Sequence, residues 1–360
     1  MISGGNGTRG EQTLEEIFSQ PESWTKSLQV LETDPAAQAA LRLARPGAEW
    51  ILIGCGTSYY LAQAAAATFN HLGLMARAVP ASEILLYPSL VMQPGREYVP
   101  LVISRSGRTS EAVRAAQVLE KEHSLRTIAI TCADKQPLEA ACSVTLKLLD
   151  GNDQSTVMTR SFTSMLLGLQ WLAATVKGNS EFRNALKGLA PQVAPLLKDV
   201  PKRLQLFVGA RAFQDFVFLA QGPLFGIASE CMLKVTESSS SYTQAFHSLE
   251  FRHGPKSIAG PETLLTFLLS ETSEDAETEL LEEMKALGAA TMVIANRISS
   301  RAQRASDFAV ELGLDAPEYA RSAAFVIWGQ LYGVYYGIKK GLNPDAPKNL
   351  TRVVELADGR

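Results

Sequence analysis

The chain has 360 residues, of which 46% are hydrophobic and 20% charged, with a net charge of -3 at pH 7. This composition is that of an ordinary globular protein, and the length exceeds what one hydrophobic core usually serves, so two domains are expected. The weak negative charge argues against nucleic acid and anionic membranes as partners, and because neither a membrane-spanning apolar run nor a secretory signal is visible, we expect a cytoplasmic protein.

The cysteines do not form a recognisable motif. C-x-x-C spacing is missing, so neither a structural zinc site nor a disulfide framework is indicated, and we expect no metal and no other cofactor. The printed sequence does not start with Met-Cys, so an N-terminal cysteine nucleophile of the glutaminase type is not expected. The four cysteines are Cys55, Cys132, Cys142 and Cys231.

The chain starts with a segment, residues 1–46, that we expect to be helical, with Thr13 and Glu16 as a capping box. Residues 50–53 then predict a strand, which breaks at the sequence GCGTS and passes into a helix over residues 59–72. A strand, a glycine turn and a helix start present backbone N–H groups to an anion, and phosphate is the natural guest. The alternative is a plain turn in which Thr57 or Ser58 only caps the helix.

A similar layout recurs over residues 98–131. A strand at 98–103 is followed by SRSGRT, a helix at 110–122 and a strand at 127–131. Ser104, Ser106 and Thr109 can donate several hydrogen bonds to phosphate oxygens, and Arg105 or Arg108 can add charge. Two hydroxyl-rich loops at the ends of parallel strands indicate one shared site, although a single loop of this kind could be only a helix cap.

Residues 151–164 are a third hydroxyl-rich stretch, which could close over a sugar phosphate through Ser155, Thr156 or Thr159. The alternative is a capped connection before an apolar helix at 165–176. Residues 182–200 are then interpreted as a linker helix.

The second half repeats the first in outline. Strands are expected at residues 204–208, with a glycine turn at 209–211, and at 264–269 and 291–295. This duplication favours two α/β domains over one large sheet. Glu271 and Glu274 stand where the first half has hydroxyls, and their carboxylates would repel a phosphate. We therefore expect one phosphate site per chain, in the first half.

Acidic and basic side chains gather in the second half. Glu230, Lys234 and Glu237 follow i, i+4 and i+7 spacing and share one helix face, and the serine run after them ends that helix. His253 precedes Gly254-Pro255, which forces a turn. The alternative is an exposed salt bridge followed by a loop histidine.

Six stretches in order, GCGTS, SRSGRT, TVMTRSFT, ECMLKVTE, FRHGPKS and PDAPKNLTRVVE, resemble the SIS (sugar isomerase) family in tandem. The likeness is closest to the isomerase half of glucosamine-6-phosphate synthase and to stand-alone amino-sugar phosphate deaminase/isomerases. It implies two duplicated SIS domains, each a parallel sheet between helices in a flavodoxin-like three-layer αβα fold. We expect a helical segment at residues 1–46, a phosphosugar-binding domain at 47–180, a second domain at 200–345, and a tail at 346–360 that contributes to the active site.

The resemblance also implies roles for individual residues. Glu237 would move a proton between sugar carbons C1 and C2, His253 would help to open the ring from the neighbouring subunit of a homodimer with shared active sites, and Lys234 and Glu230 are charged groups beside Glu237. Arg105 would contribute its backbone. Substrate contacts are implied for Cys55, Thr57, Ser58, Ser104, Arg105, Ser106, Thr109, Thr156, Met158, Lys348 and Arg352.

The tail departs from the synthase pattern. The synthase has a lysine that forms an imine with the ketose at the position of Arg352, and an arginine, which stays protonated, cannot form that imine. Lys348 is expected to reach the site only if the tail is an irregular loop. Arg352 is expected to support a substrate oxygen or the phosphate, unless the tail is only a packed surface segment.

The resemblance implies an enzyme that takes a hexose or hexosamine 6-phosphate. Because no glutaminase segment is expected, we favour a deaminase/isomerase that converts a hexosamine 6-phosphate to a ketohexose 6-phosphate and ammonia by proton transfer through an enediol or enamine. The alternatives are a fructosamine-6-phosphate deglycase, a synthase-type isomerase, and a phosphosugar sensor without catalysis.

Overall fold

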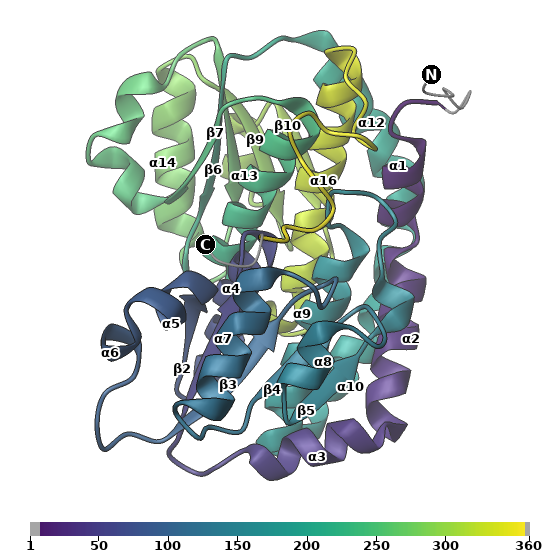
Figure 1. Ribbon diagram of the computed structural model, residues 1–360. Helices are drawn as coiled ribbons and strands as arrows, with labels where there is room; N and C mark the ends of the chain where they lie inside the picture. The colour runs from purple at the N-terminus through teal and green to yellow at the C-terminus, as the bar shows by residue number, and fades with distance from the viewer. Residues whose placement is uncertain (1–7, 357–360) are drawn as a thin grey trace, which may run out of the picture.

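The structure, a computed structural model, describes residues 8–356 and contains two five-stranded parallel sheets (Figure 1). The first, sheet A, has the order β2-β1-β3-β4-β5, and the second, sheet B, has the order β10-β9-β8-β6-β7. Read from β7, sheet B repeats the crossover pattern of sheet A, so the prediction of two duplicated α/β domains with flavodoxin-like strand order is confirmed. The strands are β1 (Glu49–Gly54), β2 (Ala76–Pro80), β3 (Tyr98–Ile103), β4 (Ile128–Thr131), β5 (Val144–Lys147), β6 (Asp215–Ala220), β7 (Thr243–His247), β8 (Thr263–Leu268), β9 (Ala290–Ala295) and β10 (Phe308–Glu311).

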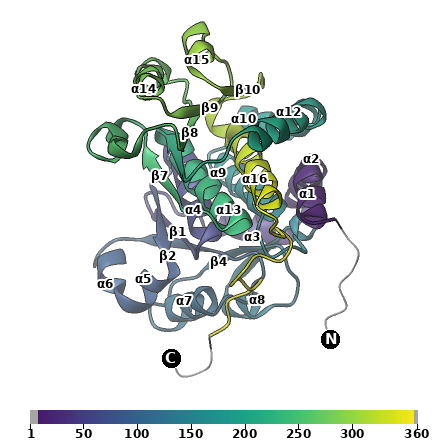
Figure 2. The ribbon, with the colours of Figure 1, turned by 90° about the horizontal axis from the view of Figure 1, so that it is seen from above.

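Helices cover both faces of each sheet (Figures 1 and 2). The central strands β1, β3, β4, β8 and β9 are buried at every residue, as apolar runs in parallel sheets are. The helices are α1 (Glu11–Phe18), α2 (Gln20–Thr33), α3 (Pro35–Leu43), α4 (Thr57–His71), α5 (Ala81–Leu86), α6 (Pro88–Val91), α7 (Ser110–Lys121), α8 (Pro137–Ala141), α9 (Arg160–Val176), α10 (Ser180–Lys187), α11 (Leu189–Val193), α12 (Leu196–Ala210), α13 (Phe225–Ser239), α14 (Glu274–Ala286), α15 (Ser300–Ala305) and α16 (Ser322–Lys339).

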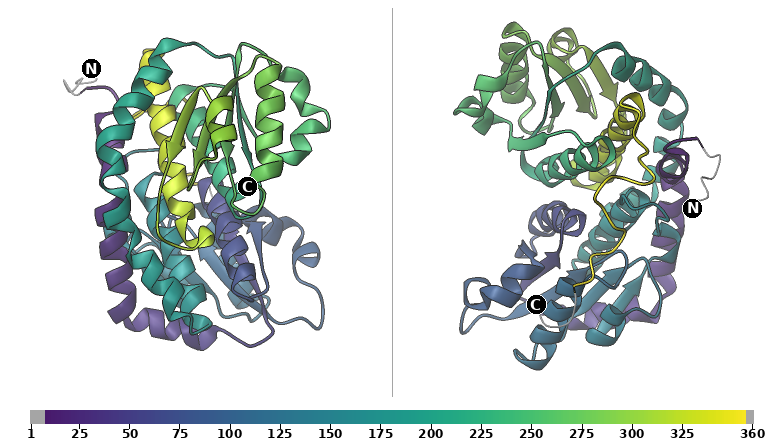
Figure 3. Two further views of the ribbon diagram at one scale, coloured as in Figure 1. Left: turned by 180° about the vertical axis from the view of Figure 1, so that it is seen from behind. Right: turned by 45° about the horizontal axis from the view of Figure 1, so that its top comes forward.

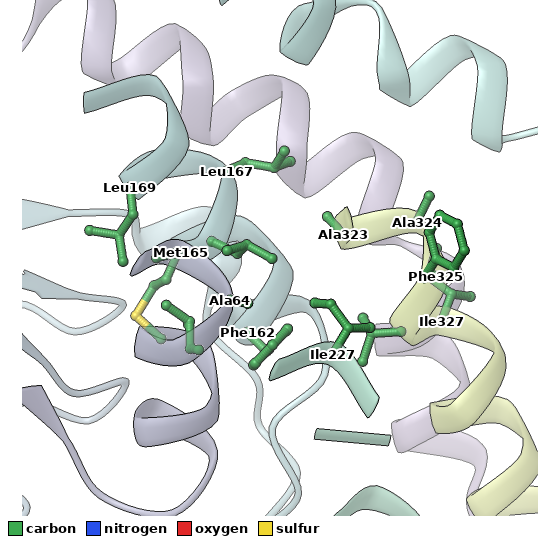
Figure 4. Packing of buried hydrophobic residues seen from close by; sticks show 14 of the residues in the cluster. Ala64, Phe162, Met165, Leu167, Leu169, Ile227, Ala323, Ala324, Phe325 and Ile327 are labelled. Carbon is green, nitrogen blue, oxygen red and sulfur yellow. The ribbon is translucent and has the colours of Figure 1, made fainter. Parts of the chain in front are cut away.

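One continuous hydrophobic core joins the two halves. Helices α4 and α9 of the first half and α13 and α16 of the second lie between the sheets (Figure 2), and their buried side chains belong to one cluster (Figure 4). The contact of α4 with α13 is close: a Cβ atom on Gly226 would lie 2.5 Å from the backbone nitrogen of Ala64. Glycine at that position therefore allows α13 to approach α4.

The two ends of the chain run along the outside of the molecule. Helix α1 packs against α16 and helix α2 against α9. After α16, the C-terminal segment leaves the second half and crosses to the loop that precedes α7 (Figure 3). Residues 1–7 of the predicted N-terminal segment and 357–360 of the predicted tail lie outside the described residues.

Three predictions about local structure are wrong. Residues 204–208, predicted as a strand, form part of α12, and the strand equivalent to β1 is β6, which starts at Asp215. Residues 182–200 belong to three helices, α10 to α12, instead of one linker helix. Thr13 and Glu16 do not form a capping box, because α1 begins at Glu11 with Gly10 as its N-cap, and both side chains contact other segments.

Among residues 8–356, no helix combines the length and the hydropathy that crossing a membrane requires. The division of the chain at residues 46, 180, 200 and 345 stays a prediction.

Candidate active site

The turn between β1 and α4 lies at the point where the order of sheet A reverses, since β2 and β3 lie on opposite sides of β1. Ligands of open α/β sheets bind at such points. A Cβ atom on Gly54 would lie 2.4 Å from the carbonyl carbon of Ser58, so only glycine lets α4 start this close to the strand. Thr57 and Ser58 are the first residues of α4, and both are buried.

The loop between β3 and α7 carries the second group of hydroxyls. The hydroxyl of Ser104 lies 3.4 Å from that of Thr109, and the hydroxyl of Ser106 accepts a hydrogen bond from the backbone N–H of Arg108 at 3.2 Å. Thr109 is the N-cap of α7 and makes no side-chain cap bond. The starts of α4 and α7 therefore present hydroxyls and two positive helix ends to one place.

Helix α13 brings a lysine and two carboxyl groups to the start of α4. The Nζ atom of Lys234 donates hydrogen bonds to Thr57 Oγ1 at 3.0 Å and to Glu237 Oε2 at 2.6 Å, and it lies 3.2 Å from Glu230 Oε1. The shared helix face predicted for Glu230, Lys234 and Glu237 is confirmed. The alternative of an exposed salt bridge is wrong, because the side chains of Lys234 and Glu230 are 1% and 0% exposed.

Burial and neighbouring charges give these groups different protonation states at neutral pH. Burial raises the pKa of Glu230 to about 8, because the nearby Lys234 offsets only part of the desolvation and Glu237 adds to the rise. Burial by itself would lower the pKa of Lys234, but Glu230 and Glu237 outweigh it and raise that pKa. Lys234 therefore carries its proton at neutral pH, whereas Glu230 is mostly neutral. Glu237 is the carboxyl group that reaches the cavity, with 19% of its side chain exposed.

Arg105 acts through its side chain, which is 5% exposed. Its Nη1 donates to the carbonyls of Ser155 (3.2 Å) and Thr156 (3.1 Å), and its Nη2 donates to the carbonyl of Arg352 (2.6 Å). One guanidinium group thus fixes both the loop before α9 and the C-terminal segment. The predicted contribution of the Arg105 backbone to the substrate stays a prediction.

The C-terminal segment forms one wall of the site. The carbonyl of Val354 accepts a hydrogen bond from the N–H of Ser110, the first residue of α7, at 3.2 Å. Arg352 Nη2 donates to Asn152 Oδ1 at 3.1 Å and to the carbonyl of Asp153. Arg108 and Glu355 form an exposed ion pair at 2.8 Å. The tail therefore contacts the first half and lines the cavity, and its contribution to the active site stays a prediction.

These segments enclose a cavity of about 190 Å³. Most of the predicted site residues line it, and the burial of Cys55 raises the pKa of its thiol to about 12, which keeps the thiol protonated. The lining residues are Cys55, Gly56, Thr57, Ser58, Arg105, Ser106, Thr109, Thr156, Met158, Glu237, Thr351, Arg352, Val353 and Val354.

Five predicted residues do not line the cavity. Lys234 and Glu230 lie behind Glu237 and Thr57, and Ser104 contacts Thr109. His253 and Lys348 are exposed, and in the described part of the chain neither makes a side-chain hydrogen bond or an ion pair.

Two other predicted hydroxyls, those of Ser155 and Thr159, make hydrogen bonds within the chain. The hydroxyl of Ser155 hydrogen-bonds with that of Thr13 at 3.2 Å, and that of Thr159 donates to Asp153 at 2.9 Å. Of the three hydroxyl residues considered in residues 151–164, Thr156 is therefore the one at the cavity.

Sequence reasoning missed several residues of this site. Tyr60 lies close enough to Glu230 and Glu237 that their charges, after burial, raise the pKa of its hydroxyl. Its position three residues after Thr57, on the same face of α4, was a usable signal. Thr351, Val353 and Val354 lie in the stretch PDAPKNLTRVVE, but they were not among the predicted contacts, because their place depends on how the tail crosses the first half.

The corresponding edge of sheet B holds a carboxylate of the chain itself. Glu277 on α14 is fully buried, and it accepts hydrogen bonds from the hydroxyls of Ser248 and Ser273 and from the backbone N–H of Ser270. Glu271, predicted to repel a phosphate there, forms an ion pair with Arg321. Within residues 8–356, no cluster of three or more His, Cys, Asp or Glu side chains is placed to hold a metal ion.

Comparison with known proteins finds a family model that matches part of the chain and relatives that cover nearly all of it. A family model for the SIS domain matches residues 47–175. The D-galactosamine-6-phosphate deaminase AgaS of Shewanella sp. (strain ANA-3) is 29% identical, over 96% of this chain and 90% of the relative. The glutamine–fructose-6-phosphate aminotransferase of Pyrobaculum aerophilum is 26% identical over 95% of this chain, which spans 57% of that longer protein.

Solved structures agree over nearly the whole chain. The crystal structure of glucosamine-6-phosphate deaminase from Thermotoga maritima superposes with a TM-score of 0.77 at 26% identity, covering 96% of this chain and 100% of that one. The tagatose-6-phosphate ketose/aldose isomerase of Escherichia coli gives a TM-score of 0.80 at 23% identity, with 94% and 97% covered, and supports the fold alone. Residues 47–175 match the SIS domain, and a second domain with the same strand topology follows them in this chain.

Proposed function

We propose that this protein is a phosphosugar isomerase/deaminase that converts a hexosamine 6-phosphate and water to a ketohexose 6-phosphate and ammonia. The observation that carries the proposal is one cavity in which hydroxyls and helix starts from the first half face the Lys234–Glu237 pair from the second. The names of the relatives support the same class of substrate.

The phosphate would be held where α4 and α7 start. Ser58, Ser106 and Thr109 supply hydroxyls at the cavity, and the two helix N-termini supply backbone N–H groups and positive dipole ends. The binding energy of this anchor would position the reacting carbons against Glu237.

Glu237 would move the proton. In the open-chain sugar, its carboxylate takes the proton from C2 and returns it to C1, which converts the amino aldehyde through an enamine to a C2 imine. Water then adds to C2, and the C–N bond breaks to leave the ketose and ammonia. A well-placed acid/base of this kind contributes about 10²–10⁴-fold to the rate. Lys234 is held protonated by two carboxyl groups, and its hydrogen bond to Glu237 orients that carboxyl group at the cavity.

The proposed reaction does not need an imine between the enzyme and the sugar. Arg352 is at the cavity but stays protonated, Lys348 is exposed outside it, and Lys234 is tied to two carboxyl groups. The side chain of Arg352 binds Asn152 and the carbonyl of Asp153, so we propose that it shapes the wall of the site.

We propose that the active form is a homodimer whose partner subunit supplies His253 for ring opening. This histidine is exposed and lies outside the cavity of its own chain, whereas the SIS resemblance gives it a role at the sugar. A cytoplasmic location likewise stays a prediction.

The test is a substrate panel that measures both ammonia and ketose phosphate. Galactosamine 6-phosphate and glucosamine 6-phosphate should each be tried, because the relatives are named for them, and release of equal amounts of ammonia and ketose phosphate from one of them is the expected result. Cleavage of 6-phosphofructosamines to glucose 6-phosphate would instead identify a deglycase. Tight binding of all these compounds without any turnover would refute the enzymatic proposal and favour a phosphosugar sensor.

A further inference from the structure

Two side chains of α1, Thr13 and Glu16, point inward and contact the segments that close the candidate site. Glu16 is 3% exposed, and its Oε1 accepts hydrogen bonds from the backbone N–H groups of Gln154 and, at 3.1 Å, Ser155. These residues begin the loop that carries Thr156 and Met158 to the cavity. The N-terminal helix therefore binds the same loop as the buried guanidinium of Arg105.

Thr13 connects α1 to the C-terminal segment. Its backbone N–H and its hydroxyl both donate to Asp345 Oδ1, at 2.8 and 2.7 Å, and its hydroxyl oxygen lies 3.2 Å from that of Ser155. Asp345 lies a few residues before the stretch of the tail that lines the cavity. One turn of α1 thus contacts both the loop before α9 and the C-terminal segment.

Glu16 and Arg105 bind different backbone groups of this loop. Glu16 accepts from the N–H groups of Gln154 and Ser155, whereas Arg105 donates to the carbonyls of Ser155 and Thr156. Charged side chains therefore bind the backbone of three consecutive residues, Gln154 to Thr156, through both N–H and carbonyl groups. Hydrogen bonds to charged groups are the stronger kind, so this arrangement leaves the loop little freedom.

The burial of Glu16 lowers the stability of the fold, which a purely structural role does not explain. Its second oxygen, Oε2, is buried and accepts no hydrogen bond from any described residue. Burial, and then the charge of Asp153 beside it, raise the pKa of Glu16. A buried carboxylate with one unsatisfied oxygen and a like-charged neighbour reduces stability, and such groups concentrate at functional sites.

We propose that Glu16 is a positioning residue for phosphosugar binding, which holds the loop at residues 154–158 so that Thr156 and Met158 face the ligand. The inference rests on the proposed function for the identity of the ligand. It does not make Glu16 a catalytic residue, because Glu16 does not line the cavity.

The experiment compares Glu16→Met, Glu16→Gln and a control, Glu15→Gln, whose glutamate is exposed on the same helix. Methionine keeps the volume but cannot accept the two N–H groups, whereas glutamine keeps one accepting oxygen. Amide hydrogen exchange of residues 154–156 in the free protein should be fastest in Glu16→Met, intermediate in Glu16→Gln and unchanged in the control.

Binding and turnover supply the second readout. Loss of two buried hydrogen bonds to a charged group should raise the dissociation constant of Glu16→Met for glucosamine 6-phosphate roughly tenfold, with partial recovery in Glu16→Gln. The kcat at saturating substrate should stay within about twofold, since Glu237 and Lys234 are untouched.

Each outcome decides between this inference and the proposed function. Exchange and affinity that are unchanged in Glu16→Met overturn the inference and leave the proposed function intact. A loss of kcat with unchanged affinity also overturns it. A wild-type protein that binds no phosphosugar would refute the proposed function, and the exchange data would then show only that Glu16 orders the loop, which overturns its role in binding as well.

Discussion

Glu230 should make the stability of this protein fall as pH rises through neutrality. Its side chain is 0% exposed, and Lys234 Nζ lies 3.2 Å from its Oε1. Burial raises its pKa from 4.5 to about 8. Between these values the folded protein keeps a proton that the unfolded chain releases. The contribution of Glu230 to the free energy of unfolding is therefore fully present below pH 4.5 and is lost as pH rises through 8, by up to about 1.4 kcal/mol per pH unit.

Glu230→Gln tests this directly, because glutamine has the shape of the neutral acid and cannot ionise. Near pH 5 the variant and the wild type should have similar free energies of unfolding. From pH 5 to pH 8 the free energy of unfolding of the variant should rise, relative to that of the wild type, by about 1 kcal/mol per pH unit, or a few kcal/mol in all. Urea unfolding at four pH values measures the difference, with Glu279→Gln, an exposed glutamate, as the control. If the free energies of unfolding of the wild type and Glu230→Gln change equally with pH over this range, Glu230 is not a buried neutral acid and the reasoning fails.

Three further experiments test the site. Glu237→Gln should lower kcat by about 10²–10⁴-fold but change the dissociation constant for a hexose 6-phosphate by less than about twofold, and undiminished turnover would remove Glu237 from the mechanism. Ser106→Ala combined with Thr109→Ala should weaken binding of a hexose 6-phosphate roughly tenfold or more, with no effect on the unphosphorylated sugar, as calorimetry with both sugars would show. Mixed His253→Ala and Glu237→Gln subunits should regain about a quarter of wild-type activity if sites are shared in a dimer, and no recovery after confirmed subunit exchange would contradict sharing.

The parts of the fold and site that depend on local sequence could be predicted. The glycine turn before α4 and the hydroxyl loop before α7 follow buried strands, so their place at the edge of sheet A followed from the pattern. The common face of Glu230, Lys234 and Glu237 followed from helix geometry alone. Each of these features is encoded within about ten residues.

The errors have a physical reason in common, which is that a short pattern fits two structures. Residues 204–208 are an apolar run that could be a strand or a buried helix turn, and the following glycine suggested the wrong choice. Thr13 and Glu16 have capping-box spacing, but tertiary contacts use both side chains. The guanidinium of Arg105 contacts carbonyls about fifty residues later, and local sequence carries no information about them.

The structure shows a difference between the two halves that the sequence analysis did not consider. Glu271, which was expected to repel a phosphate, pairs with Arg321, and that expectation stays a prediction. In addition, the hydroxyls of Ser248 and Ser273 and the N–H of Ser270 converge on the buried carboxylate of Glu277, which belongs to the first turn of α14. These are the kinds of donors that the first half presents to its cavity, so an anion covalently attached to the chain already satisfies them. In α7 the position equivalent to Glu277, four residues after the N-cap Thr109, is Val113, and the hydroxyls of Ser106 and Thr109 line the cavity. We infer that the duplication gave two anion-binding edges, one closed by Glu277 and one left for the sugar phosphate.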